Sequence, residues 1–179
     1  MVNENIIFLD IDGVLNCSTT KECTPDKFRG VESRFIKNLA EVVNEFNASI
    51  VLSSDWKRFW DIDPKKCRDD AIYLNEQLAK YGLSISDKTS DDSDGQNIYT
   101  QRGWGIHQFL RDHPEVKRWI VIDDNEFLDF DVPIQNHFVY IADPNEGFSE
   151  YYKNRAIRAL KGEIQSPERE WDRFKRKYL

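Results

Sequence analysis

The chain alternates between short, continuous apolar runs and longer stretches in which apolar residues recur with helical spacing. The apolar runs predict five strands, at residues 6–9, 49–52, 83–85, 119–122 and 137–141. The helical spacing predicts five helices, at residues 33–46, 69–81, 103–112, 149–161 and 167–178. Strands that alternate with helices and are apolar throughout indicate a three-layer α/β fold, in which a parallel sheet carries helices on both faces.

Three of the predicted strands end in groups that can bind a cation or a phosphate: Asp10 and Asp12, Ser53 and Ser54, and Asp123 and Asp124. Residues two apart in an extended chain point the same way, so Asp10 and Asp12 share one side. Ligands of open parallel sheets bind beyond the carboxyl ends of the strands, where all three segments would meet. Carboxylates that face one another repel, and Mg²⁺, which prefers oxygen ligands, relieves that repulsion. We therefore expect a Mg²⁺ site at this edge.

Alternative interpretations of the segment around Asp10 and Asp12 account for fewer of these residues. A solvated turn accounts for Asp and Gly, but not for the polar groups at two further strand ends. A calcium-binding EF-hand loop is excluded, because Val14 and Leu15 stand where that loop is polar and Lys21 stands where it closes with Glu. The three histidines and three cysteines lack the spacing of a zinc site or a disulfide framework.

The order and spacing of these segments resemble the haloacid dehalogenase (HAD) superfamily of phosphohydrolases. The matching motifs are IIFLDIDGVLN, SIVLSS and WIVIDDN, and the resemblance covers residues 6 to about 160. The segments SSDWKR, RGWGIHQFL, VIDDN and NEGF further resemble the HAD domains associated with Swiss-army-knife RNA-repair proteins. This resemblance implies a Rossmann-like HAD fold and a phosphatase that acts through an aspartyl-phosphate, with Mg²⁺ as cofactor.

The resemblance also implies roles for the four acids. Asp10 would be the nucleophile, and Asp12 would protonate the leaving oxygen and then activate water. The Asp10 carboxylate and the Asp12 backbone carbonyl would ligate Mg²⁺. Asp123 and Asp124 both belong to the candidate metal-binding set. Asp124 is the favoured ligand of the pair, directly or through water, and Asp123 is expected to orient a cation in the phosphate pocket.

A second set of residues would bind the phosphoryl group. The resemblance implies that Ser53 holds a phosphoryl oxygen, aided by the Ser54 amide. The chain departs from the family pattern by lacking a suitably placed lysine before the fourth strand. Arg102 is the candidate in its place, because a guanidinium can pair with both phosphate and Asp123. Lys57 is the alternative cation.

Two segments near the predicted site bear on the substrate. Residues 17–31 are long enough for a flap, and residues 86–102 form a polar loop, so we expect a capless or minimally capped site that is open to bulky substrates. After the second strand, Trp56 and Lys57 begin a run of interleaved aromatic and basic residues. These aromatic rings either stack on a base or pack as anchors in the core, and the sequence leaves both open.

Length, charge and hydrophobicity bear on the number of domains and on the location of the protein. The 179 residues suit a single domain, 1–179, and the net charge is −7. Residues 151–179 carry a local charge of +5, and residues 162–179 read as a basic amphipathic C-terminal helix that we expect to dock on the domain. With no signal peptide and no apolar run of membrane-spanning length, we expect a cytoplasmic protein without a membrane partner. The oligomeric state is not indicated.

The predicted function is therefore Mg²⁺-dependent phosphomonoester hydrolysis, with a nucleotide or nucleic-acid-end phosphate as the favoured substrate. A phosphatase of small sugar or metabolite phosphates is one alternative. A non-catalytic module that binds phosphate or nucleic acid is another. A response-regulator-like phosphoacceptor is disfavoured, because its acid pair precedes the strand of the phosphorylated aspartate, the reverse of the order in this chain.

Overall fold

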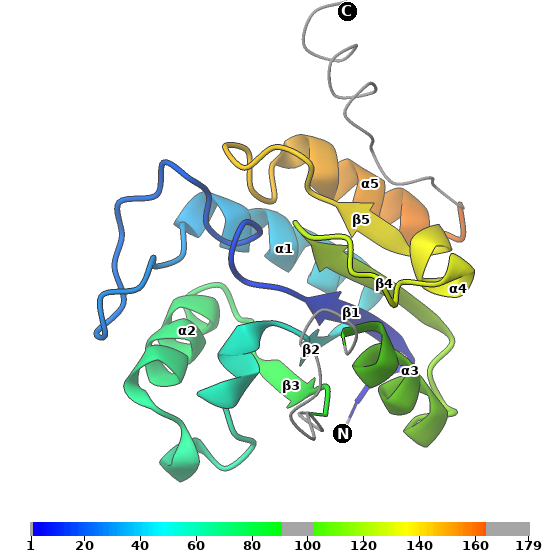
Figure 1. Ribbon diagram of the computed structural model, residues 1–179, viewed down its shortest axis with the longest axis horizontal. Helices are drawn as coiled ribbons and strands as arrows, with labels where there is room; N and C mark the ends of the chain where they lie inside the picture. Colours follow the sequence, from blue (N-terminus) through cyan, green and yellow to red (C-terminus); the bar gives the residue numbers. More distant parts are fainter. Residues whose placement is uncertain (1, 91–101, 164–179) are drawn as a thin grey trace, which may run out of the picture.

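Figure 1 shows the computed structural model, which describes residues 2–90 and 102–163 of the chain. The first half of the chain contains β1 (Asn5–Leu9), α1 (Ser33–Phe46), β2 (Ser49–Leu52), the 3₁₀ turns η1 (Asp55–Arg58) and η2 (Pro64–Lys66), α2 (Asp69–Ala79) and β3 (Ile85–Lys88). The second half contains α3 (Arg102–Asp112), β4 (Arg118–Asp123), α4 (Val132–Asn136), β5 (Phe138–Tyr140) and α5 (Glu150–Leu160).

The described strands form one parallel sheet in the order β3-β2-β1-β4-β5. The chain moves outward from β1 through β2 to β3, and then returns to place β4 on the other side of β1. In the register, Leu9 of β1 pairs with Leu52 of β2 and with Ile122 of β4. The reversal of strand order between β1 and β4 is the switch point at which open α/β sheets form their sites.

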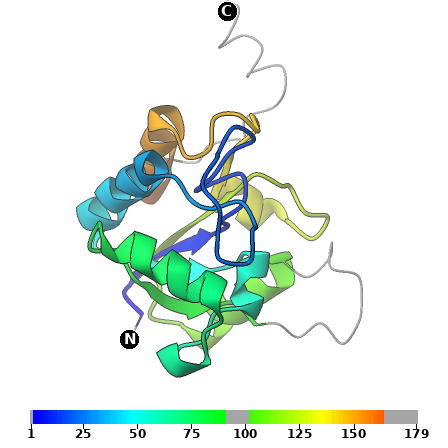
Figure 2. The same ribbon diagram turned by 90° about the vertical axis from the view of Figure 1, so that its left-hand side faces the viewer.

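Helices cover both faces of the sheet (Figures 1 and 2). Ile7 and Leu9 of β1 belong to the apolar cluster that includes α1, α2 and α5. Ile6 and Phe8 alternate with them and belong to the cluster that includes α3 and α4. Because β1 is buried on both faces, its apolar run is continuous, and the three-layer arrangement predicted from the sequence is confirmed.

Most predicted elements are found, and the differences concern short ones. The helix 33–46 and the strand 49–52 have the expected bounds. The prediction of a strand at 83–85 was wrong by two to three residues, because Leu83 still bonds to the Leu78 carbonyl in the turn that ends α2, and β3 starts at Ile85. The single-turn α4 and the two 3₁₀ turns were missed, since they are too short to show a helical period.

Some expectations fall beyond the described residues. The polar loop expected at 86–102 begins with residues that belong to β3, and its residues 91–101 lie outside the described part. The helix expected at 167–178 lies outside it as well. Within residues 2–90 and 102–163, no helix combines the length and apolar character needed to cross a membrane.

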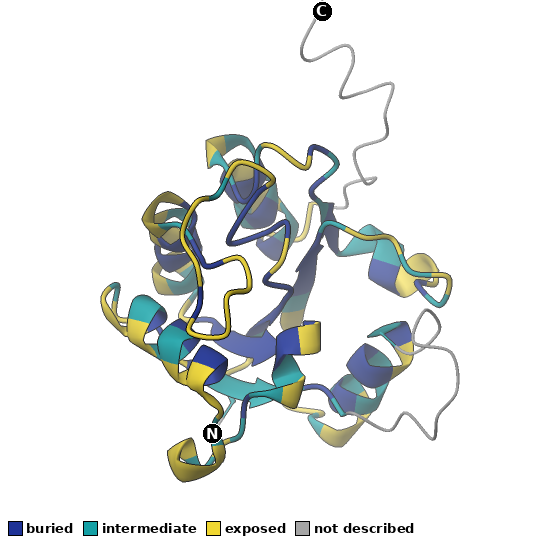
Figure 3. Ribbon diagram, turned by 60° about the vertical axis from the view of Figure 1, so that its left-hand side comes forward, coloured by how far each residue is buried: buried dark blue, intermediate teal, exposed yellow. Residues whose placement is uncertain are grey.

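Residues 17–31 form a flap, a largely exposed excursion after β1 (Figure 3). An isolated antiparallel β-bridge between the backbones of Cys23 and Arg29 closes the far end of the flap. The flap is attached to α2, because the Asp26 amide donates to Asp70 Oδ1 at 3.2 Å and the Val31 amide donates to Tyr73 Oη at 3.2 Å. The segment after β1 is therefore a flap and not a cap domain, as the sequence predicted.

Candidate active site

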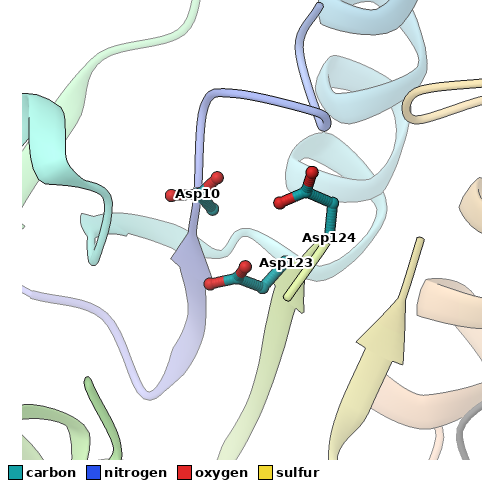
Figure 4. A group of neighbouring side chains, drawn as sticks. All are labelled: Asp10, Asp123 and Asp124. Carbon is teal, nitrogen blue, oxygen red and sulfur yellow. The ribbon is translucent and has the colours of Figure 1, made fainter. Parts of the chain in front are cut away.

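Three carboxylates from two strands converge at the switch point (Figure 4). Asp10 follows β1, Asp123 ends β4, and Asp124 comes next; one carboxylate oxygen from each lies within 4.8 Å of the others. The Asp10 amide donates to the Ile122 carbonyl at 3.0 Å, which fixes the two strand ends relative to each other. Asp10 and Asp123 are buried, and Asp124 is partly buried.

The turn after β1 passes very close to the acid pair. Gly13 has a φ of +73°, and a Cβ atom there would lie 2.0 Å from Asp124 Oδ2. The turn is held by the amides of Val14 and Leu15, which donate to the Ile11 carbonyl, and the side chains of both residues are buried in the core. Glycine is required at this position for its conformation and for the space that Asp124 occupies.

Arg102, the first residue of α3, supplies the positive charge among these acids. Its Nη1 lies 2.9 Å from Asp10 Oδ1 and 3.3 Å from Asp123 Oδ2, and it also donates to the Ser53 carbonyl. The guanidinium stacks 4.5 Å from the centre of the Phe127 ring. This side chain is only 10% exposed, so the ion pairs are shielded from water.

Lys57, the alternative cation, points elsewhere. Its ammonium donates to the Ser90 carbonyl at 2.9 Å and to Thr89 Oγ1 at 3.4 Å, beyond the end of β3. The geometry therefore places Arg102, rather than Lys57, against the acids.

The acids carry more negative charge than Arg102 neutralises. Burial raises the pKa of Asp10 although Arg102 opposes the shift, and burial together with the charge of Asp10 raises the pKa of Asp123 well above its usual value. Burial and the charges of Asp10 and Asp12 raise the pKa of Asp124 to about 7. A divalent cation bound by these oxygens would offset both the burial and the repulsion that raise the three pKa values.

Buried polar atoms of the site also suit a metal and a phosphoryl group. Among the described residues, Ser53 Oγ is buried without a hydrogen-bond partner, and Asp123 Oδ2 is buried with an ion pair to Arg102 but no hydrogen bond. Ser53 is 1% exposed, and its amide donates to the Leu9 carbonyl at 3.0 Å, which holds the residue at the end of β2 beside β1. Buried polar atoms of this kind are costly unless a ligand satisfies them, so the donor set fits Mg²⁺ and a bound phosphate.

Asp12 lies on the exposed side of the turn, and each of its oxygens accepts one hydrogen bond. Asn16 Nδ2 donates to Oδ1 and the Trp56 indole nitrogen donates to Oδ2, both at 2.9 Å. Asn16 Oδ1 also accepts from the Gly13 amide at 2.9 Å. The sequence interpretation missed Asn16, although its position four residues after Asp12, in a chain that turns back at Gly13, was a usable signal.

Two aromatic residues after β2, Trp56 and Trp60, are anchored in the core. Trp56 is 4% exposed and Trp60 is 6% exposed, and both pack in the core with α1 and α2. The buried ring of Trp56 favours the anchor interpretation over contact with a substrate base, because only its N–H reaches the site. Ser54 caps η1 and accepts from the Trp56 amide at 3.4 Å.

Comparison with known proteins identifies one family. Residues 6–152 match the family described as "HAD domain in Swiss Army Knife RNA repair proteins", which is most of the chain. No curated protein and no solved structure matches the chain.

Proposed function

The chain belongs to the family of HAD domains in Swiss Army Knife RNA repair proteins, and on this basis we propose that it is a Mg²⁺-dependent phosphomonoester hydrolase acting through an aspartyl-phosphate. Family membership supports phosphohydrolase activity in general. The observation that carries the finer proposal is the convergence of three carboxylates, two of which, Asp10 and Asp123, pair with the guanidinium of Arg102.

In the first step, an oxygen of the Asp10 carboxylate attacks phosphorus. The bond between phosphorus and the leaving oxygen breaks, its electron pair stays on that oxygen, and the Asp12 carboxyl gives it a proton. In the second step, Asp12 takes a proton from water, and the water oxygen attacks phosphorus. The bond to Asp10 breaks, which releases phosphate and regenerates the Asp10 carboxylate.

The remaining residues supply charge and position. Asp10, Asp124 and the Asp12 carbonyl would hold Mg²⁺, which neutralises negative charge when bound. Arg102 faces the nucleophile and would contact the phosphoryl oxygens, while Asp123 keeps the guanidinium in place. Ser53 Oγ would donate to a phosphoryl oxygen, which gives this orphaned hydroxyl a partner. Phosphoryl transfer depends mainly on such positioning and charge stabilisation.

The test of the mechanism is Asp10→Asn, which preserves shape and removes the nucleophile. We expect hydrolysis of an aryl phosphate with Mg²⁺ to fall by at least about 10³-fold. Asp112→Asn, at the exposed end of α3, is the matched control and should keep the wild-type rate. Equal rates for Asp10→Asn and wild type would exclude Asp10 as the nucleophile. Mg²⁺ binding without turnover of any phosphate ester would favour the non-catalytic module instead.

Within this activity, we propose a nucleotide or nucleic-acid-end phosphate as the substrate. The family description supports this choice, as does the small size of the flap, which leaves room for a bulky leaving group. The check is a panel of 3′- and 5′-phosphorylated nucleotides and oligonucleotides beside sugar phosphates. Activity confined to sugar phosphates would replace this substrate class with the metabolite alternative.

A further inference from the structure

The hydrogen bond between Trp56 and Asp12 joins the buried core to the exposed acid of the site. Trp56 lies in η1 and is 4% exposed, and its indole nitrogen donates to Asp12 Oδ2 at 2.9 Å. We propose that Trp56 is a positioning residue that holds Asp12 in the orientation required for proton transfer to the leaving oxygen. The inference rests on the proposed function of Asp12 as the acid and base of a phosphatase.

The backbone of Trp56 is held by hydrogen bonds on both sides, so its indole group can hold the Asp12 carboxylate in one orientation. Its amide donates to Ser54 Oγ at 3.4 Å, and its carbonyl accepts from the Phe59 amide at 2.9 Å. Asp12 is on an exposed turn, where its carboxylate could rotate freely without these contacts. With Asn16 on one oxygen and Trp56 on the other, the plane of the carboxylate is set before substrate binds.

The chemistry of the indole group gives this contact a specific effect. Indole N–H is a donor only, so it can hold an oxygen of the Asp12 carboxyl group but cannot take the proton that Asp12 transfers. As the phosphorus–oxygen bond breaks, the Asp12 proton moves to the leaving oxygen and negative charge develops on the Asp12 carboxylate. The Trp56 donor stays on Asp12 Oδ2 during this transfer and keeps the carboxyl group aimed at the leaving oxygen.

The proposal can be tested through the leaving group. A nitrophenolate leaving oxygen is weakly basic and departs with little help, whereas an alkoxide departs only when it is protonated. Trp56→Phe should therefore lower kcat/KM for an alkyl phosphate by about tenfold more than for 4-nitrophenyl phosphate. We choose kcat/KM because it reports the first step, in which the leaving group departs.

Trp60→Phe is the matched control. Trp60 is also buried, at 6% exposed, but its indole nitrogen donates to Asn75 Oδ1 of α2 at 3.2 Å. Both variants lose one buried indole N–H, so thermal unfolding should show similar destabilisation. Only Trp56→Phe should change the ratio of the two kcat/KM values. If Trp56→Phe unfolds, the sulfur isostere of tryptophan at position 56 removes the donor while keeping the ring shape.

The outcomes separate the two proposals. Equal losses on both substrates in Trp56→Phe, or the same change of ratio in Trp60→Phe, would overturn the positioning role and leave the phosphatase proposal intact. No turnover by the wild type, or full activity of Asp10→Asn, would overturn the proposed function and this inference with it. A change of ratio confined to position 56 supports the inference.

Discussion

Gly13 is the residue at which the turn after β1 meets the acid pair after β4. In Gly13→Ala, the new Cβ would lie 2.0 Å from Asp124 Oδ2, at a φ of +73° that costs an alanine about 1 kcal/mol. We expect Asp124 to be displaced and Mg²⁺ affinity, measured by calorimetry, to fall at least about tenfold.

Gly82→Ala is the control for backbone strain alone. Gly82 has nearly the same φ, +72°, but no atom lies within 4 Å of the added Cβ. It should lose comparable stability while keeping wild-type Mg²⁺ binding. Unchanged Mg²⁺ affinity in Gly13→Ala would contradict the close contact with Asp124.

At this scale, residue type and strand position predicted which groups meet, but not which way each side chain points. The expected meeting of Asp10, Asp123 and Arg102 is found. The parallel strands β1 and β4 end at one edge of the sheet, and α3, which comes after β3, begins at the same edge. Trp56 was a candidate for substrate binding, but interleaved aromatic and basic residues suit either a binding surface or the core, and its ring is buried. Its direction follows from the path of η1, which no periodicity in four residues could indicate.

Among the elements, the flap is attached to the start of α1 through Glu32. The Glu32 carboxylate accepts from Arg34 Nε at 2.6 Å, from Thr20 Oγ1, and from Cys17 Sγ at 3.5 Å. Burial raises the pKa of Glu32, but these hydrogen bonds outweigh burial and lower it below the usual 4.5. Because the folded pKa is lowered, the stabilisation is complete above pH 4.5 and is lost as pH falls through the folded value.

Glu32→Gln should therefore loosen the flap at neutral pH. We expect faster proteolytic cleavage within residues 17–31 and a melting temperature about 2–4 °C lower at pH 7, with the difference from wild type shrinking below pH 4.5. Glu22→Gln is the control, because its carboxylate is exposed and accepts from the neighbouring Lys21 amide at 3.2 Å. A melting-temperature difference that does not shrink as the pH falls below 4.5 would contradict the role of the charged carboxylate.

The elements that the sequence predicted best are those whose burial produces a complete pattern. α1 buries one face over fourteen residues, and β2 is buried throughout, so both have the expected bounds. β3 lies at the edge of the sheet and reads Ile-Ser-Asp-Lys, with three of four residues only partly buried. An edge strand of this kind lacks the apolar run that identifies a central strand. The strand was therefore predicted at 83–85, where the residues are more apolar than in β3 itself.

On the scale of the whole molecule, the site lies between the two halves of the sheet, β3-β2-β1 on one side and β4-β5 on the other. Asp10 follows β1 and Asp124 follows β4, so a shared Mg²⁺ would link strand ends on either side of the switch point. Arg102, which leads α3, is within ion-pair distance of Asp10 and Asp123 without a metal. The stability of the whole fold should therefore depend on both metal and pH.

Asp124 determines whether the stability of the metal-free protein rises or falls with pH. Its pKa is raised to about 7, from a usual 3.8, by burial and the charges of Asp10 and Asp12. A raised carboxyl pKa stabilises the fold fully below pH 3.8, and that stabilisation is lost as pH rises through about 7. The metal-free protein should thus melt at a lower temperature at pH 8 than at pH 6. Saturating Mg²⁺ should raise the pH 8 value by about 5–10 °C, because it binds only the folded state.

Asp124→Asn separates charge repulsion from metal binding. At pH 8 without metal, this variant should melt at a higher temperature than wild type, because it removes a charge that the fold holds near Asp10. With Mg²⁺ the order should reverse, since the variant lacks a metal ligand and gains little from the ion. Thermal unfolding in chelator and in Mg²⁺ measures both effects, with Asp112→Asn as the exposed control. A variant that gains as much as wild type from Mg²⁺ would show that Asp124 does not bind the ion, and the strand ends would then be linked by Asp10 and Asp123 alone.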